Sequence, residues 1–589
     1  MLHELVAYAD THLADSEPGF KTREVRWCIE LATDGRFLNI LPLGDGNRGA
    51  DLPRCPDMHA MNAGGKSHFL VESAQTVALL FKANEDDKKI AGAKTRHRFY
   101  IWLLREAAKS EPQLGLLADV LEDHDRREPI RTALATHRAK PSDWVTWRID
   151  GRDPRLEAEV QAWWRVWRRA DQGNEPVTGS GEGATTTDPK LMLCLLTGLP
   201  TKPLPTHPKI TGLSSVGGIA MGDVMVGFDK AAFGSYGLDQ SANAAMSAEA
   251  TQKYVDALNY LIRHHSRKLA NTLVAHWYRH SLPPEDDPLA FLVDFEADEQ
   301  SEAASLAAAR RLLDAIRAGE RPDLANNHYY ALTLSGAAGR VMVRDWMEGS
   351  FENLVSHITA WFADLQIVAR DGNGNARDPK FMAVCGALVR DLKDLPAPTA
   401  ATLWKVAIQG LPIPQPFLAQ ALGRFRTDLV DQDQPAFNHA RMGLMKAYFI
   451  RSKPGGDNTM TVTYNPNHPA AAYHCGGLLA LFANLQRAAL GDVGAGVVQR
   501  FYAAASQTPG LVLGRLAANA RNHLAKLEPK LAWWYEERIA EIMSELGDAA
   551  PRILDLEGQG LFALGYYQKL AQLRAGNKSA TETTSQQEV

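Results

Sequence analysis

The spacing of apolar residues predicts a helix and then a hairpin at the start of the chain. Leu2, Leu5 and Ala9 recur three and four residues apart, which is the period of a helix packed on one face. Two apolar runs then flank Asp34-Gly35, a dipeptide that favours a tight hairpin because glycine accepts a positive φ. We therefore expect an N-terminal region of mixed helix and strand.

A helix rich in tryptophan and arginine is predicted next. Its aromatic and basic residues are Trp163, Trp164, Trp167, Arg165, Arg168 and Arg169. Such a helix can stack bases or hold phosphate, but we favour a core helix with a solvated arginine face. The segment 171–189 is rich in Gly, Ser and Thr and buries too little apolar area to order itself, so it is predicted to be a linker.

Residues 227–250 combine glycines, aromatic residues and amides directly before another predicted helix. Ser247 is placed to cap that helix. From Lys253 to His280 the chain carries five Lys and Arg residues against the single acid Asp256, and an acidic segment follows. Such separation of charge suits a protein with one local anionic partner surface.

The rest of the chain predicts strands followed by helices. Residues 328–350 read as two strands with a turn at Gly336–Gly339, and nearly all of 381–573 has helical periodicity. The predicted fold class is therefore α+β, an N-terminal mixed domain with a largely antiparallel sheet followed by a C-terminal α-helical bundle. The predicted parts are 1–170 (α+β with helices), 171–189 (linker), 190–394 (second α+β region), 395–575 (helical bundle) and 576–589 (disordered tail).

Composition narrows the class of protein. The 589 residues carry a net charge of −5, which excludes a protein that coats nucleic acid by bulk positive charge. The five cysteines form no C-x-x-C pair, which indicates a reducing compartment. No apolar run approaches the length of a membrane span and no signal peptide is apparent. We expect a soluble, cytoplasmic protein that makes no membrane contact.

A search for catalytic motifs finds none of the common ones. G-x-S-x-G, H-E-x-x-H, the Walker loop and a strand-linked G-x-G-x-x-G are absent. His264 and His265 are adjacent and would diverge by about 100° on a helix, so they are poorly placed to share a metal. Gly336–Gly339 resembles a G-x-x-G phosphate clamp, but the flanking strands favour a hairpin turn. We expect no catalytic residue, no metal and no cofactor.

Two loops have the composition of a DNA-groove contact. One runs from Ser235 to Asn243, and the other contains Asn62 and Lys66 beside two glycines. Glycine lets backbone approach a duplex closely, amides and hydroxyls donate to groove acceptors, and an amide can wedge between base steps. The same amides could instead cap backbone groups of a turn, and composition leaves both interpretations open.

Several phrases, in order along nearly the whole chain, resemble the large subunit of the subtype I-C CRISPR interference complex, Cascade. They are PGF with VRW, GGKSHFLVESA, CLLTG before HPKITG, FGSYGLDQSANA before KYVDALNYL, LTLSGAAGRVMVRDW, and LEGQGLFALGYYQ. The Ser-Tyr-Gly-x-x-Gln-x-x-Asn-Ala phrase is the most specific. Asp229 departs from the Asn common in the family, and Ala245 from its usual Pro.

The resemblance implies a non-enzymatic subunit of an RNA-guided surveillance complex. It would recognise a protospacer-adjacent motif in duplex DNA, help to open the duplex into an R-loop, contact the 5′ handle of the CRISPR RNA, and help to recruit a helicase-nuclease. Its partners would be CRISPR RNA, target duplex and displaced strand, the Cascade backbone and handle-binding subunits, and a small subunit. That small subunit would correspond to the C-terminal bundle, translated from an internal start such as Met442, Met445 or Met460.

The loops and basic residues give three sets of candidate contacts. The motif-reading residues would be Asn62, Lys66, Tyr236, Gln240, Ser241 and Asn243. The phosphate contacts would be Lys253, Arg263, Arg267, Lys268 and Arg340. The strand-binding residues of the C-terminal bundle would be Arg487, Arg500, Arg515, Arg521 and Lys526. Two alternatives stay open: a stand-alone metal-dependent nuclease, if distant carboxylates converge, and a purely structural scaffold subunit.

Overall fold

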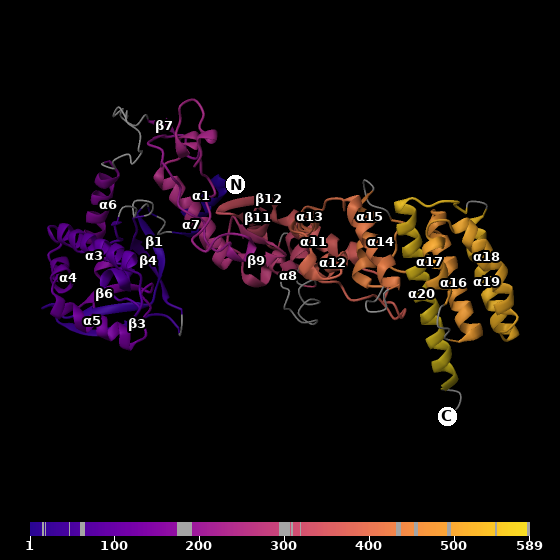
Figure 1. The fold of residues 1–589 in the computed structure, drawn as a ribbon. Helices are drawn as coiled ribbons and strands as arrows, with labels where there is room; N and C mark the ends of the chain where they lie inside the picture. Colours follow the sequence, from indigo (N-terminus) through magenta and orange to yellow (C-terminus); the bar gives the residue numbers. More distant parts are fainter. Residues whose placement is uncertain are drawn as a thin grey trace. The chain divides into compact units, whose positions relative to one another are not determined.

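The chain is represented here by a computed structural model that forms two compact units (Figure 1). Unit 1 comprises residues 1–214, 218–264 and 336–341, and unit 2 comprises 215–217, 265–335 and 342–589. Most of the predicted linker 171–189 lies outside the described residues. The structure describes residues 1–13, 17, 19–45, 48–58, 65–173, 191–293, 307, 310–318, 320–430, 437–452, 458–491, 496–547 and 550–585.

Unit 1 contains a four-stranded sheet in the order β3-β2-β6-β5, formed by β3 (Phe37–Pro42), β2 (Trp27–Leu31), β6 (Trp144–Ile149) and β5 (Glu72–Ser73). β2 and β3 pair antiparallel around the predicted hairpin turn, where Gly35 has a φ of +79°. β2 and β6 are parallel, and the remaining neighbours are antiparallel. A second antiparallel pair joins β1 (Phe20–Val25) to β4 (Ala50–Pro56).

Helices α3, α4, α5 and α6 pack around these strands (Figure 1). Apolar side chains from the sheet and from α3, α4, α5 and α6 share one buried core. α1 packs against α7, the helix that follows the amide-rich loop. The helices are α1 (Leu2–His12), α2 (Ala74–Val77), α3 (Asp87–Ala108), α4 (Gln113–Glu122), α5 (His124–Thr136), α6 (Ala158–Gly173) and α7 (Ala248–His264).

The tryptophan-rich helix α6 is a core helix. Trp164 is fully buried, and its indole N–H donates to the carbonyl of Gly19 at 2.7 Å. The arginine face is not solvated as expected, because Arg168 is buried and Arg165 donates two hydrogen bonds to Glu17. The aromatic rings are therefore occupied in packing, and the side chain at 169 lies outside the described residues.

Short elements connect α6 to α7. They are β7 (Met192–Leu193), β8 (Pro200–Thr201), and the 3-10 turns η3 (Ser214–Val216), η4 (Ala231–Phe233) and η5 (Gln240–Ala244). The predicted cap of α7 is present, since the Ala250 N–H donates to Ser247 Oγ at 3.1 Å. The predicted amide-rich loop therefore ends on a well-defined helix start.

Unit 2 begins with an antiparallel sheet and continues as helices, which confirms the predicted α+β class. The sheet order is β12-β11-β10-β9, formed by β9 (Ser266–Leu269), β10 (Thr272–Tyr278), β11 (His328–Ala337) and β12 (Arg340–Ser350). β11 and β12 are joined at Ala338-Gly339, both with positive φ, so the G-x-x-G phrase forms the predicted hairpin turn rather than a phosphate clamp. Side chains from the sheet and the helices form one extensive core.

The helices of unit 2 include α8 (Pro288–Val293), α10 (Pro322–Ala325), α11 (Phe351–Leu365), α12 (Phe381–Gly386), α13 (Ala397–Gln409), α14 (Gln415–Val430), α15 (His439–Ser452), α16 (Ala471–Leu490), α17 (Val497–Ala505), α18 (Pro509–Leu524), α19 (Pro529–Leu546) and α20 (Leu556–Ser585). The sequence predicts disorder for the segment 576–589, but α20 continues into it as far as Ser585. No proline interrupts the helix there, and adding a residue to an existing helix costs much less free energy than starting a new one. The last four residues of the segment lie outside the described part.

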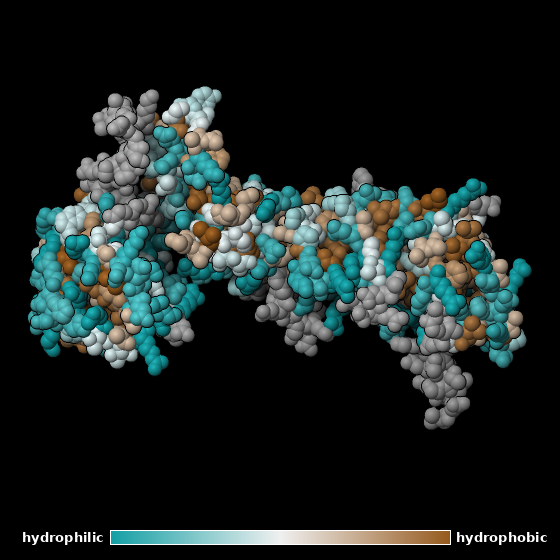
Figure 2. Space-filling view, in the orientation of Figure 1, coloured by the Kyte–Doolittle hydropathy of each residue, from teal (hydrophilic) through white to brown (hydrophobic). Residues whose placement is uncertain are grey.

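The surface in view is mostly hydrophilic, with separate apolar residues between the charged ones (Figure 2). Among the described residues, no helix combines the length and the hydropathy that a membrane span requires.

Candidate nucleic-acid interface

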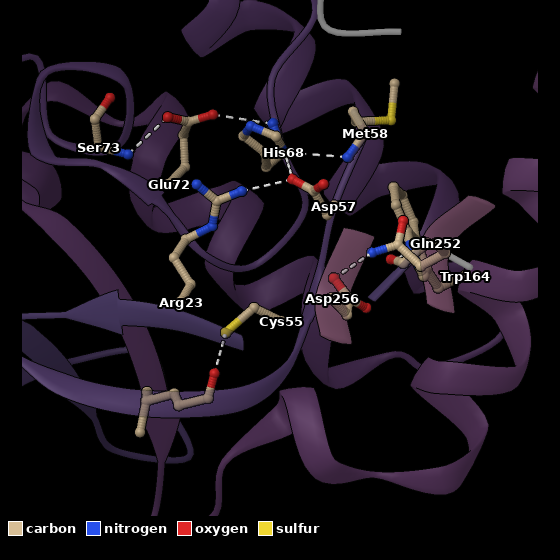
Figure 3. Close-up of polar contacts among 12 residues, drawn as sticks. Arg23, Cys55, Asp57, Met58, His68, Glu72, Ser73, Trp164, Gln252 and Asp256 are labelled. Atoms are coloured by element: carbon tan, nitrogen blue, oxygen red, sulfur yellow. Dashed lines mark hydrogen bonds and ion pairs between the residues drawn. The ribbon is translucent and has the colours of Figure 1, made fainter. Parts of the chain in front are cut away.

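A buried polar cluster ties together the two ends of the loop that carries Lys66 (Figure 3). The Met58 backbone N–H lies 3.1 Å from His68 Nδ1, and Asp57 Oδ1 lies 2.9 Å from the same nitrogen. Asp57 also accepts a hydrogen bond of 2.5 Å from Arg23. The residues on either side of the predicted loop are therefore fixed, and Asn62 lies outside the described residues.

Glu72 holds the far side of this base. Its buried carboxylate accepts the backbone N–H of His68 at 2.9 Å and that of Ser73 at 2.7 Å, and such charge-assisted bonds offset the cost of burying it. We call Arg23, Asp57, His68 and Glu72 the loop neck. The neck has no signal in the sequence, because its members come from separate segments that no local pattern joins.

The second predicted loop is a braced turn, and we call residues 231–244 the probe loop. Ser235 and Leu238 pair across a two-residue turn, with the Leu238 N–H donating to the Ser235 carbonyl at 2.9 Å. The Asn243 amide accepts from the Ser235 N–H and donates to the carbonyls of Leu238 and Gln240, each at 3.0 Å. Asn243 therefore holds the loop together instead of facing a groove as the sequence suggested.

Tyr236 stands at the tip of the probe loop. Tyr236 and Gly237 have φ values of +53° and +69°, as in the tight type I′ turn of hairpins. The left-handed region costs a non-glycine residue roughly 1–2 kcal/mol, and the Tyr236 side chain is 100% exposed, so no packing offsets that cost. Gln240 is also exposed with a φ of +46°. Backbone strain beneath two exposed side chains on a braced loop makes this loop a candidate functional site.

Ser241 differs from the expected groove contact because it is buried. Its side chain is 1% exposed, and its Oγ has no hydrogen-bond partner among the described residues. Its backbone N–H donates to the Pro205 carbonyl at 3.1 Å. Two residues after Pro205, the Nδ1 atom of His207 lies 2.7 Å from the Tyr254 hydroxyl. Burial lowers the pKa of His207 to about 4. Ser241 thus belongs to the packed underside of the probe loop.

Two of the predicted phosphate contacts already have carboxylate partners. Lys253 Nζ lies 2.8 Å from Asp10 and 2.7 Å from Glu249, and these two hydrogen bonds raise the pKa of Lys253. Arg263 lies 3.2 Å from Asp51. A phosphate would have to compete with these carboxylates, so neither side chain is a preformed phosphate contact.

The other three predicted contacts differ from one another. Arg340 reaches the start of the probe loop, with Nη2 3.0 Å from Asp229 and the guanidinium 5.2 Å from the Phe233 ring. It therefore anchors the loop. Arg267 and Lys268 lie exposed on β9, and no carboxylate in the described part of the chain forms an ion pair with either. They are the two predicted phosphate contacts whose charge is available.

The five predicted strand-binding residues of the C-terminal bundle are all exposed. Four of them fall between Gly496 and Leu527, a stretch that contains no Asp or Glu. The two helices of that stretch, α17 and α18, therefore carry positive charge without acidic side chains of their own. The residues are Arg487 on α16, Arg500 on α17, Arg515 and Arg521 on α18, and Lys526 just after α18.

Nothing in the described residues gathers three or more His, Cys, Asp or Glu side chains as a metal site would. The probe loop presents an exposed aromatic ring and an exposed amide, and β9 and α17–α18 present exposed basic side chains. This combination fits contact with a nucleic-acid duplex at one place and with a phosphate backbone elsewhere.

Comparison with known protein families extends this picture. A family model described as CRISPR-associated protein (Cas_Csd1) matches residues 5–574, which include both units. A search of curated proteins finds no match to the chain. The resemblance that the sequence phrases indicate is confirmed by the family match.

Proposed function

The chain belongs to the Cas_Csd1 family of CRISPR-associated proteins, and on that premise we propose that it is the non-catalytic, motif-reading large subunit of an RNA-guided surveillance complex. Within a Cascade complex it would recognise the protospacer-adjacent motif in duplex DNA and help to open the duplex into an R-loop. It would also contact the CRISPR RNA 5′ handle and help to recruit the helicase-nuclease in the cytoplasm.

The observation that carries the proposal is the tip of the probe loop. An uncharged aromatic ring stands fully exposed on a two-residue turn that three side-chain hydrogen bonds brace. A rigid aromatic side chain can enter a base step, where stacking contributes roughly 1–3 kcal/mol per base. We assign this wedge role to Tyr236, and we assign groove contacts to the exposed amide of Gln240.

The protein itself need not recognise a long DNA sequence. Guide pairing supplies most of the sequence recognition, so the protein has to read only a short motif and hold the backbone. We assign that task to the probe loop, together with Asn62 and Lys66 of the other predicted loop. A net charge of −5 is compatible with it because the basic residues are concentrated locally.

Phosphate contacts complete the proposal. Arg267 and Lys268 supply available positive charge on β9, and the acid-free α17–α18 stretch supplies it on the C-terminal bundle. We assign the bundle to the backbone of an opened DNA strand, which a row of arginines binds without reading sequence. The same bundle is the part that a small subunit translated from an internal start would repeat.

The test uses the assembled complex with its guide RNA and two linear duplexes that differ only in the adjacent motif. Gln240→Ala should reduce the preference for the correct motif. Tyr236→Ala should weaken binding to the intact duplex by roughly 5-fold to 100-fold, and a duplex with a pre-opened bubble should restore it. Wild-type behaviour of both variants on both duplexes would instead support the scaffold alternative.

Catalysis requires a separate measurement. We propose that the subunit cuts no nucleic acid itself, so the purified protein with Mg²⁺ or Mn²⁺ should leave labelled single-stranded and duplex DNA intact. Cleavage that co-purifies with the subunit and is lost in a carboxylate variant would favour the nuclease alternative.

A further inference from the structure

The hairpin of β7 and β8 in unit 1 presents leucine side chains to solvent. The segment 191–199 has the sequence LMLCLLTGL, and an apolar run of this kind normally indicates a buried strand. A single exposed leucine needs no explanation, but contiguous exposed leucines mark an interaction site. Here four leucines are each between 60% and 72% exposed, and we call them the leucine patch: Leu191, Leu193, Leu195 and Leu199.

The leucine patch is held in place by bonds to the start of α7. Cys194 lies between the leucines and is buried, and its Sγ accepts the backbone N–H of Ser247, the cap of α7, at 3.3 Å. The Leu195 N–H donates to the Ala245 carbonyl at 2.9 Å. Within the hairpin, the Cys194 N–H donates to the Leu199 carbonyl at 2.9 Å. The hairpin is therefore fixed to the segment that joins the probe loop to α7.

The composition of the hairpin is unsuited to two classes of partner. Residues 191–201 contain no Lys, Arg or His, so they offer no positive charge to a phosphate backbone. They contain no Trp, Tyr or Phe either, so they lack the rings that stack on bases or that sit at the headgroup level of a membrane. The surface is aliphatic, and such a surface binds because contact with other apolar side chains removes it from water.

A second copy of the chain offers too small a contact for the leucine patch. A leucine side chain buries on the order of 100 Å². Four of them meeting the same four across a twofold axis fall short of the roughly 800 Å² per partner that a standard interface buries. A groove on a different protein can enclose both sides of the hairpin together with its backbone, and so reach that size.

We propose that the leucine patch docks into an apolar groove of another protein subunit of the same complex. That the neighbour belongs to the same complex rests on the proposed function, whereas the apolar docking surface does not. Because the hairpin is bonded to the Ala245 carbonyl and the Ser247 N–H, docking also fixes the base of the probe loop relative to that neighbour. The leucine patch thus acts in assembly, and the probe loop acts on DNA.

The test uses the full-length protein and a complex assembled from the other subunits and the guide RNA. Two variants, Leu193→Gln and Leu195→Gln, replace an apolar side chain by a polar one of similar size. The matched control is Leu156→Gln, at a leucine that is 55% exposed on the 3-10 turn Pro154–Leu156. Affinity for the complex is measured at low and at high salt. Hydrogen exchange of residues 191–201 is compared between the free and the assembled protein.

Leu193→Gln and Leu195→Gln should each weaken incorporation roughly 10-fold at both salt concentrations, because central apolar contacts dominate an interface and salt does not screen them. Leu156→Gln should assemble as the wild type does. All three free variants should unfold at the wild-type temperature, since substitutions at exposed positions change stability little. Hydrogen exchange of 191–201 should slow on assembly.

Normal incorporation of both patch variants, or unchanged exchange at 191–201, would overturn the proposal. So would a free protein that is a dimer and becomes a monomer in Leu193→Gln, because the occupant would then be a second copy. Weaker binding of Leu193→Gln to phosphatidylcholine vesicles, or to the guide RNA alone, would overturn it in favour of a membrane or of nucleic acid. A wild-type protein that fails to join the complex would overturn the proposed function as well, whereas failure of the variants alone to show a defect concerns only the leucine patch.

Discussion

Asn243→Ala removes the brace of the probe loop, and the structure allows the size of the effect to be worked out. Three hydrogen bonds of 3.0 Å are lost, each worth about 1 kcal/mol net. Asn243 is half-buried, so hydrogen bonds to water replace part of these bonds, and we expect the braced turn to be destabilised by about 2 kcal/mol. Tyr236 and Gln240 keep their left-handed backbone cost of roughly 1–2 kcal/mol each. The braced turn should then become a minor conformation.

Binding of duplex DNA should report the lower population of the braced turn directly. Apparent affinity falls in proportion to the fraction of protein in the competent conformation, and about 2 kcal/mol changes the ratio of braced to open turn roughly 30-fold, which is the upper limit of the effect. In the assembled complex, Asn243→Ala should bind duplex with the correct motif more weakly, by up to roughly 30-fold. Affinity for an altered motif should hardly change. Hydrogen exchange of the backbone amides of 235–240 should become faster.

Asn259→Ala is the matched control. Its amide braces a different segment of unit 1 by accepting from the Thr211 N–H at 2.8 Å and its hydroxyl at 3.2 Å. It should lower stability by a similar amount and leave motif discrimination intact. The reasoning is refuted if Asn243→Ala keeps full discrimination, or if Asn259→Ala loses as much of it.

Three further predictions follow from the neck, the charges and the buried histidine. His68→Ala should reduce motif discrimination and leave the affinity for a pre-opened target unchanged. His68→Asn can place a polar atom near the position of Nδ1 and should restore much of the discrimination. Equal behaviour of the two variants would contradict a positioning role. Lys268→Ala should weaken DNA binding equally for all sequences and lower the salt slope of binding by about 0.9. Lys253→Ala loses its bonds to Asp10 and Glu249, so it should lower stability and leave the slope unchanged. A reversal of these two results in salt titrations would contradict the assignment. Burial lowers the pKa of His207 from its usual 6.5 to about 4. Between these pH values the unfolded chain binds a proton that the folded chain does not, so the free energy of unfolding should fall by about 3 kcal/mol as the pH drops through that range. Urea unfolding of His207→Gln should show a flatter pH profile, and an unchanged profile would contradict burial of a neutral imidazole.

Elements with a local cause were predictable from the sequence. The Asp34-Gly35 hairpin follows from the conformational freedom of glycine, and the start of α7 follows from the hydroxyl of Ser247. The turn at Ala338-Gly339 follows from the strands that flank it. Phrases spread along the chain were likewise sufficient to identify the family, because they combine many weak local signals in a fixed order.

Features that depend on distant partners were not predictable in this way. The charge of Lys253 looks free in the sequence, but Asp10 comes to it from the first helix of the chain. The direction of an amide is equally invisible, so Asn243 and Ser241 could be assigned to a groove although one braces the loop and the other is buried. Arg574 on α20 likewise donates to the backbone carbonyl of Arg370, a contact between distant segments that exists because the chain at Gly372 packs against that helix.

The central claim is that the tip of the probe loop enters duplex DNA beside the guide-complementary segment. A photo-crosslinking amino acid at position 236 of the assembled complex tests it most directly, with the same label at the exposed position 102 on α3 as the control. We predict a crosslink from 236 to the bases of the adjacent motif, and none from 102. A label at 236 that reaches only another protein subunit, or no DNA at all, would contradict the account.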